Sequence, residues 1–189
     1  MAIWRPFSVS LLRLLKLPLT VTQMLWVNLI MDTFAAGALA SLPPNKSVMK
    51  HKPRKNEDFI ITKKMRKNIL FTGLSFTAIL FCLLFFFRDA NGDISNYNLS
   101  KFFTIFVMLQ FWNMFNVKAF GSGKSAFHNI SHSFGFIVVL LLILVGQILI
   151  VQFGGEVFRT VPLRIEDWII IIGGTSLILW IGEIKRLFF

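Results

Sequence analysis

Long apolar runs, separated by short polar and basic stretches, dominate the hydrophobic pattern of this chain. Five of these runs approach the roughly 20 apolar residues that a helix needs to cross a bilayer. They cover residues 21–42, 69–87, 102–118, 134–153 and 168–184. The pattern therefore predicts an all-α protein, a polytopic membrane bundle of about five transmembrane helices.

The first 17 residues do not fit this pattern. They are too short and too rich in cations to form another span, and they lack a clear signal-peptide cleavage site. We therefore expect two units: an atypical segment over residues 1–17 and a membrane domain over residues 18–189. The first unit could be the remnant of a preceding helix, and whether Met1 is a genuine start stays open.

Charge sets the expected orientation. The chain has 20 Lys and Arg against 9 Asp and Glu, and nine of the cations lie between the first two apolar runs. By the positive-inside rule the loop over residues 43–68 faces the cytoplasm, and alternation places the C-terminus there too. Cations arranged in this way suit a lipid bilayer and not a nucleic acid, so we predict a multi-pass protein of the cell membrane.

Two polar residues interrupt the first apolar run. Asn28 and Asp32 are four residues apart, so they share one face of an α-helix. An Asp near the centre of a membrane helix costs roughly 2.5 to 3.5 kcal/mol on insertion scales, and it usually faces a bundle interior or an ion path. The pair offers the hard oxygen ligands that calcium prefers. Spacing alone leaves an alternative open, an interhelical hydrogen-bond pair that holds the bundle together.

Further amides lie in later runs. Gln110, Asn113 and Asn116 are spaced by three and predict a polar stripe that faces protein. Gln110 could complete a site with the first pair, or form an interhelical hydrogen bond. Gln147 stands alone in an aliphatic run, where a packing role is expected.

Two other motifs resemble a nucleotide site and a metal site but lack required residues. Residues 121–125 read Gly-Ser-Gly-Lys-Ser, but the Walker pattern requires a glycine where Lys118 stands. His128 and His132 have the spacing of a metal pair without a nearby third ligand, so we expect a solvated or lipid-headgroup face. No loop is long enough to bury a core of its own. We therefore expect no catalytic residue and no cofactor-binding residue on this chain.

One segment resembles a known family. The region around Asn28 resembles the sixth membrane helix of calcium-transporting P-type ATPases. The resemblance is carried by residues 17–20 (Leu-Pro-Leu-Thr), residues 23–29 (Gln-Met-Leu-Trp-Val-Asn-Leu), Asp32 and residues 42–44 (Leu-Pro-Pro). The four later runs resemble the last four helices of that family. The resemblance implies that Asn28 and Asp32 are calcium ligands. Met31 and Gln110 are similar to the plasma-membrane type, which implies one calcium ion per cycle.

Much of such a pump is missing from this chain. The phosphorylation motif Asp-Lys-Thr-Gly, the motif Thr-Gly-Glu and the ion ligands of the fourth and fifth helices are absent. Calcium takes about 6 to 8 oxygens, whereas Asn28 and a bidentate Asp32 supply about three, or four with Gln110. The resemblance thus implies calcium as the transported ion, with ATP and magnesium bound only by domains absent from this chain.

The leading hypothesis is a C-terminal membrane segment of a plasma-membrane-type calcium pump, which contributes part of the intramembrane calcium site. Its partner would be the remaining N-terminal part of the pump, helices one to five and the cytoplasmic domains. Alone it would be incomplete and inactive, so whether the chain counts as an enzyme stays open. The alternative is a stand-alone, non-enzymatic membrane protein, either a small channel or a pump-associated subunit. Selectivity for calcium over manganese stays open as well.

Overall fold

The computed structural model describes residues 19–42, 61–90, 92–130 and 133–188, and within these residues it contains helices and loops but no strand. The elements are α2 (Val21–Asn28), η1 (Leu29–Ala35), α3 (Ala36–Ala40), α4 (Lys63–Phe86), α5 (Asn96–Lys118), α6 (Phe134–Phe153), α7 (Gly155–Phe158) and α8 (Ile165–Phe188). The predicted all-α bundle is confirmed. The atypical segment over residues 1–17 and most of the loop over residues 43–68 lie outside the described residues.

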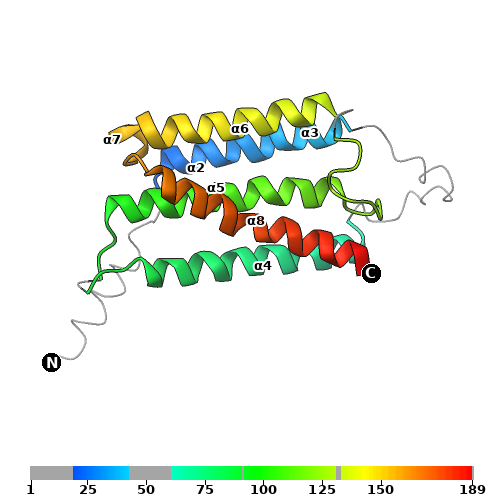
Figure 1. Cartoon of the computed structure of the whole chain (residues 1–189), viewed down its shortest axis with the longest axis horizontal. Coiled ribbons are helices and arrows are strands. Elements are labelled where there is room, and N and C mark those ends of the chain that lie inside the picture. Colours follow the sequence, from blue (N-terminus) through cyan, green and yellow to red (C-terminus); the bar gives the residue numbers. More distant parts are fainter. Residues whose placement is uncertain (1–18, 43–60, 91, 131–132, 189) are drawn as a thin grey trace.

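Three helices in the described part of the chain are long and apolar enough to cross a membrane: α4, α6 and α8. Two further elements run beside them, α5 and the broken helix made of α2, η1 and α3 (Figure 1). α5 carries Asn, Gln and Lys along its length, which makes it less apolar than its neighbours. It is nevertheless the central helix of the bundle, and Phe103 and Met108 on it are fully buried.

Two helices, α4 and α5, begin several residues before their apolar runs, and each begins at a side-chain cap. Thr62 accepts a hydrogen bond from the backbone N–H of Met65 at 3.2 Å, so α4 begins at Lys63. Ser95 does the same for the N–H of Asn98 at 3.2 Å, so α5 begins at Asn96. A cap satisfies one of the backbone donors that a helix start leaves unpaired, and this makes a polar first turn stable.

The helices cover one another unequally. α6 packs against η1 and α3, and α5 packs most extensively against α8. α4 lies along α5 at the edge of the bundle, and Phe76 is its one buried residue in the described structure. Most of the apolar surface of α4 therefore faces outward, toward lipid or toward protein outside this chain.

A seam of polar contacts joins α5 to α8. Tyr97 donates a hydrogen bond to Asp167, and Lys101 forms an ion pair with the same carboxylate at 2.6 Å. Further along, Trp112 Nε1 donates to Thr175 Oγ1 at 3.1 Å, and Asn116 Nδ2 donates to the carbonyl of Ile178 at 3.0 Å. These directional contacts fix the rotation of α5 about its own axis.

Candidate functional site

The first membrane segment is not a continuous α-helix. α2 ends at Asn28, and the next seven residues, Leu29–Ala35, form a π-helix. π-helices are rare, form i→i+5 hydrogen bonds and occur frequently at functional sites. The α-to-π boundary therefore falls at Asn28, and Asp32 lies within the π segment.

This backbone differs from the one that the spacing argument assumed. In a regular α-helix the residue four positions after Asn28 comes back to the same face, whereas the wider π turn changes the angle between Asn28 and Asp32. Residues 29–35 contain neither Gly nor Pro, the usual sequence signals of an irregular helix. The π segment therefore has no signal in the sequence.

The start of α2 is anchored to the neighbouring α7. Thr20 and Gln23 form a capping box, with the N–H of Gln23 donating to Thr20 Oγ1 at 3.3 Å and the N–H of Thr20 donating to Gln23 Oε1 at 2.8 Å. Gln23 is 1% exposed, and its Nε2 donates to the carbonyl of Phe158 at 2.8 Å. Thr22 Oγ1 donates to the carbonyl of Val157 at 2.8 Å. The first turn of α2 is thereby held in place.

A second anchor joins the middle of α2 to α6. Trp26 Nε1 donates to Gln147 Oε1 at 3.2 Å, and Gln147 is fully buried. The indole ring lies over Gly146, where a Cβ would come within 2.5 Å of Trp26 Cη2. The packing role expected for Gln147 is therefore an interhelical hydrogen bond.

The three predicted ligands have different surroundings. Asn28 is exposed on the surface of the bundle, and Gln110 is half-buried on α5. Neither side chain forms a hydrogen bond with any residue that the structure describes. The side chain of Asp32 lies outside the described part of the structure. The three residues remain a predicted site, and no hydrogen bond within the described structure links Asn28 to Gln110.

Gln110 lies on the side of α5 that faces away from α8. At 3.6 residues per turn, the positions of Tyr97, Lys101, Trp112 and Asn116 average about 190° from Gln110 around the helix. These four residues make the seam with α8, so the seam points Gln110 in the opposite direction. Gln110 therefore takes no part in the seam between α5 and α8.

The predicted polar stripe therefore divides into two roles. Asn116 donates to α8 and also accepts a hydrogen bond from Arg186 Nη2 at 3.0 Å. Gly182 makes room for its amide, because a Cβ there would overlap the Asn116 side chain. Asn116 holds helices together, whereas Gln110 has no such role within the described structure.

The described residues contain no group of three or more His, Cys, Asp or Glu that could hold a metal ion. Any ion bound at Asn28 and Asp32 therefore relies on amide, hydroxyl or backbone oxygens, or on groups outside the described residues.

The family described as "Cation transporting ATPase, C-terminus" matches residues 16–188. This chain belongs to that family. The match spans every helix from α2 to α8, so it includes both the π segment and the seam between α5 and α8.

Several relatives in the family are similar over most of this chain. Calcium-transporting ATPase PAT1 of Dictyostelium discoideum is 38% identical over 173 residues, which cover 85% of this chain and 16% of that protein. Plasma membrane calcium-transporting ATPase 2 of Oreochromis mossambicus is 39% identical over 161 residues, 80% of this chain and 14% of that protein. Plasma membrane calcium-transporting ATPase 3 of Homo sapiens is 38% identical over 162 residues, 80% of this chain and 13% of that protein.

These relatives confirm the resemblance to the plasma-membrane type. They also show that the chain corresponds only to the C-terminal membrane region of the cation-transporting ATPases that it matches. The chain spans 13 to 16% of the length of those three relatives.

Proposed function

We propose that this chain is the C-terminal membrane segment of a calcium-exporting pump, and that it supplies Asn28, Asp32 and Gln110 to an intramembrane calcium site. The observation that carries the proposal is the state of Asn28. Its amide is exposed at the boundary between α2 and the π segment, and it forms no hydrogen bond with the described residues. A residue that served only to hold these helices together would be bonded across them, as Asn116 is.

The site is proposed to be shared with other parts of the pump. Asn28, a bidentate Asp32 and Gln110 offer about four oxygens, and calcium takes about 6 to 8. The remaining oxygens would come from the N-terminal part of the pump, helices one to five, on the open sides of α2 and α4. ATP and magnesium would act in the cytoplasmic domains of the same pump.

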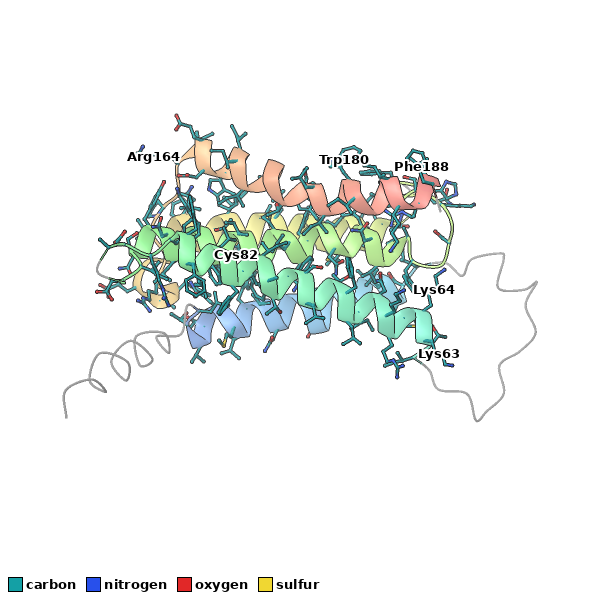
Figure 2. All side chains as sticks on the ribbon, turned by 90° about the horizontal axis from the view of Figure 1, so that it is seen from below. Lys63, Lys64, Cys82, Arg164, Trp180 and Phe188 are labelled. Carbon is teal, nitrogen blue, oxygen red and sulfur yellow. The ribbon has the colours of Figure 1, made fainter. Side chains whose placement is uncertain are left out.

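The proposed orientation places the C-terminus and the loop over residues 43–68 in the cytoplasm. Lys63 and Lys64, which belong to that basic stretch and begin α4, lie at the same end of the bundle as Phe188, and Arg164 lies at the opposite end (Figure 2). This arrangement supports the alternation of helices on which the orientation rests. The basic end would then face the anionic lipid of the inner leaflet.

Grafting tests the proposal. Residues 18–189 would replace the corresponding region of the human plasma membrane calcium-transporting ATPase 3, and ATP-dependent uptake of radioactive calcium would be measured in inside-out vesicles. We expect Asp32→Asn to reduce uptake at subsaturating calcium by about tenfold or more, because it removes the one charged ligand that this chain supplies. Asp89→Asn is the matched control, since Asp89 lies exposed in the turn between α4 and α5.

The alternative of a stand-alone channel or subunit predicts different behaviour. A channel would form a defined homo-oligomer and would pass calcium across liposomes without ATP. A graft that transports normally with Asp32→Asn, together with such a conductance from the purified chain, would replace the pump proposal with the channel.

A further inference from the structure

The two halves of the first membrane segment are attached to the bundle very differently. α2 makes three side-chain hydrogen bonds to other elements, from Thr22 and Gln23 to α7 and from Trp26 to α6. Among the described side chains of residues 29–42, the one hydrogen bond is local, from Ser41 Oγ to the carbonyl of Ala38 at 2.8 Å. At the α-to-π boundary the attachment thus changes from side-chain hydrogen bonds to packing, because η1 and α3 lie against α6 with Ala35 and Ala38 buried.

Trp26 is the last of these anchors before the boundary. Its ring occupies the space above Gly146, and its N–H meets the oxygen of the next residue on α6, Gln147. The ring packs over one residue of α6, and the hydrogen bond is directed at the next. Together these two contacts fix the position of α2 along α6 and the rotation of α2 about its own axis. Asn28 follows Trp26 by two residues, about 200° around an α-helix. Holding Trp26 against α6 therefore turns Asn28 away from α6.

Gln147 is poorly suited to a purely structural role. It is 0% exposed, and its Nε2 has no hydrogen-bond partner within the described structure. An apolar residue of similar size would fill this space without burying an unpaired amide donor. What an apolar residue cannot provide is the acceptor for Trp26.

We infer that Trp26 and Gln147 are positioning residues for the calcium site: they hold α2 against α6 so that Asn28 is presented in a fixed place. This inference rests on the proposed function.

The grafted pump provides the test, with two measurements on each variant. One is the calcium concentration for half-maximal uptake, and the other is the midpoint of thermal inactivation. Trp26→Phe keeps an aromatic ring but removes the N–H, and Gln147→Leu removes the acceptor. We expect each to raise the half-maximal calcium concentration about fivefold, the effect of one lost hydrogen bond, with the maximal rate little changed.

The double variant separates positioning from stability. Trp26→Phe with Gln147→Leu replaces both partners by apolar groups, so the buried amide is gone and thermal stability should recover. A positioning role predicts that the half-maximal calcium concentration stays raised although stability has recovered. A purely structural role predicts that both return to the values of the unsubstituted graft, and that result would overturn the inference.

Two controls distinguish failure of the positioning role from failure of the proposed function. Trp180→Phe makes the same chemical change at a residue that is 53% exposed on α8, and it should leave both measurements unchanged. If Asp32→Asn abolishes uptake but Trp26→Phe leaves the half-maximal calcium concentration unchanged, the positioning role is wrong and the site stands. If Asp32→Asn has no effect, the proposed site is wrong and the inference falls with it.

Discussion

Polar side chains within the membrane helices fall into two groups at the residue scale. Asn116, Trp112 and Gln23 each bond to another element, and these bonds offset the cost of placing polar atoms among apolar ones. Asn28 and Gln110 form no bond with the described residues. Whether a polar residue has a partner within this chain is therefore what separates a structural role from a candidate functional one.

Glu183 belongs to the bonded group and gives a stability prediction. Its Oε1 accepts the backbone N–H of Ala126 at 2.6 Å and pairs with Arg186 at 2.8 Å, which ties the loop after α5 to α8. Glu183→Ala leaves the buried N–H of Ala126 without its acceptor, so we expect the free energy of unfolding to fall by about 1 to 3 kcal/mol. Thermal denaturation of the purified chain in detergent micelles measures the change.

Lys185→Ala is the matched comparison for Glu183→Ala. It changes a charged residue two positions away that is exposed. We expect it to alter stability by no more than about 0.5 kcal/mol. Equal effects of the two substitutions would contradict the role given to Glu183.

The π segment is the decisive feature at the element scale. A single wider turn between two α-helical pieces changes which residues lie above one another, without a Pro or Gly in the sequence. α2 on one side of it is bonded to α6 and α7, while α3 on the other side packs against α6 without a described side-chain hydrogen bond to it. The segment thus combines a half held by side-chain hydrogen bonds and a half held by packing.

Deleting one residue tests the importance of this turn. An α-turn holds one residue fewer than a π-turn, so deletion of Ile30 should convert residues 29–35 to α-helix while the span still crosses the membrane. We expect the grafted pump to insert normally and to lose calcium uptake, because Asp32 is rotated relative to Asn28. Surface labelling measures insertion, and vesicle uptake measures transport.

Leu29→Ile keeps the residue count and serves as the control for that deletion. It should preserve uptake, because the length of the π segment does not change. Normal uptake by the Ile30 deletion would show that the π segment has no part in transport.

Uneven coverage of the helices is the main feature of the whole molecule. α5 is surrounded by α4, α6 and α8, but α4 leaves most of its residues exposed, and α2 leaves Asn28 exposed. Apolar surface can face lipid without penalty, whereas an exposed amide within a membrane span calls for a polar partner. These exposed surfaces of α2 and α4 are where the proposed remainder of the pump would pack.

Orientation in the membrane is the prediction at this scale. An epitope tag after Phe189 should be accessible only in permeabilised cells, and a tag inserted after Asn91, between α4 and α5, should be accessible in intact cells. The expectation follows from the excess of cations at residues 46–67 and from alternation of the helices. Accessibility of both tags in intact cells would contradict the proposed topology, and a tag on the cytoplasmic side of the intact human pump provides the control for membrane integrity.

The order of the apolar runs, the excess of cations and the residues around Asn28 were enough to predict an all-α membrane bundle and its family. These features depend on local composition, because a span must bury its backbone in hydrocarbon and a basic loop stays in the cytoplasm. The apolar runs did not predict the polar first turns of α4 and α5, because side-chain caps stabilise helical turns that are not apolar.

Tertiary structure alone decided which polar residues are bonded to one another. The pairs Trp26 and Gln147, Trp112 and Thr175, and Asn116 and Arg186 are 121, 63 and 70 residues apart in the chain. No periodicity within one helix encodes such a pairing, because it depends on how two helices rotate and slide against each other. The same holds for the π turn, whose wider backbone at Leu29–Ala35 no local residue signals.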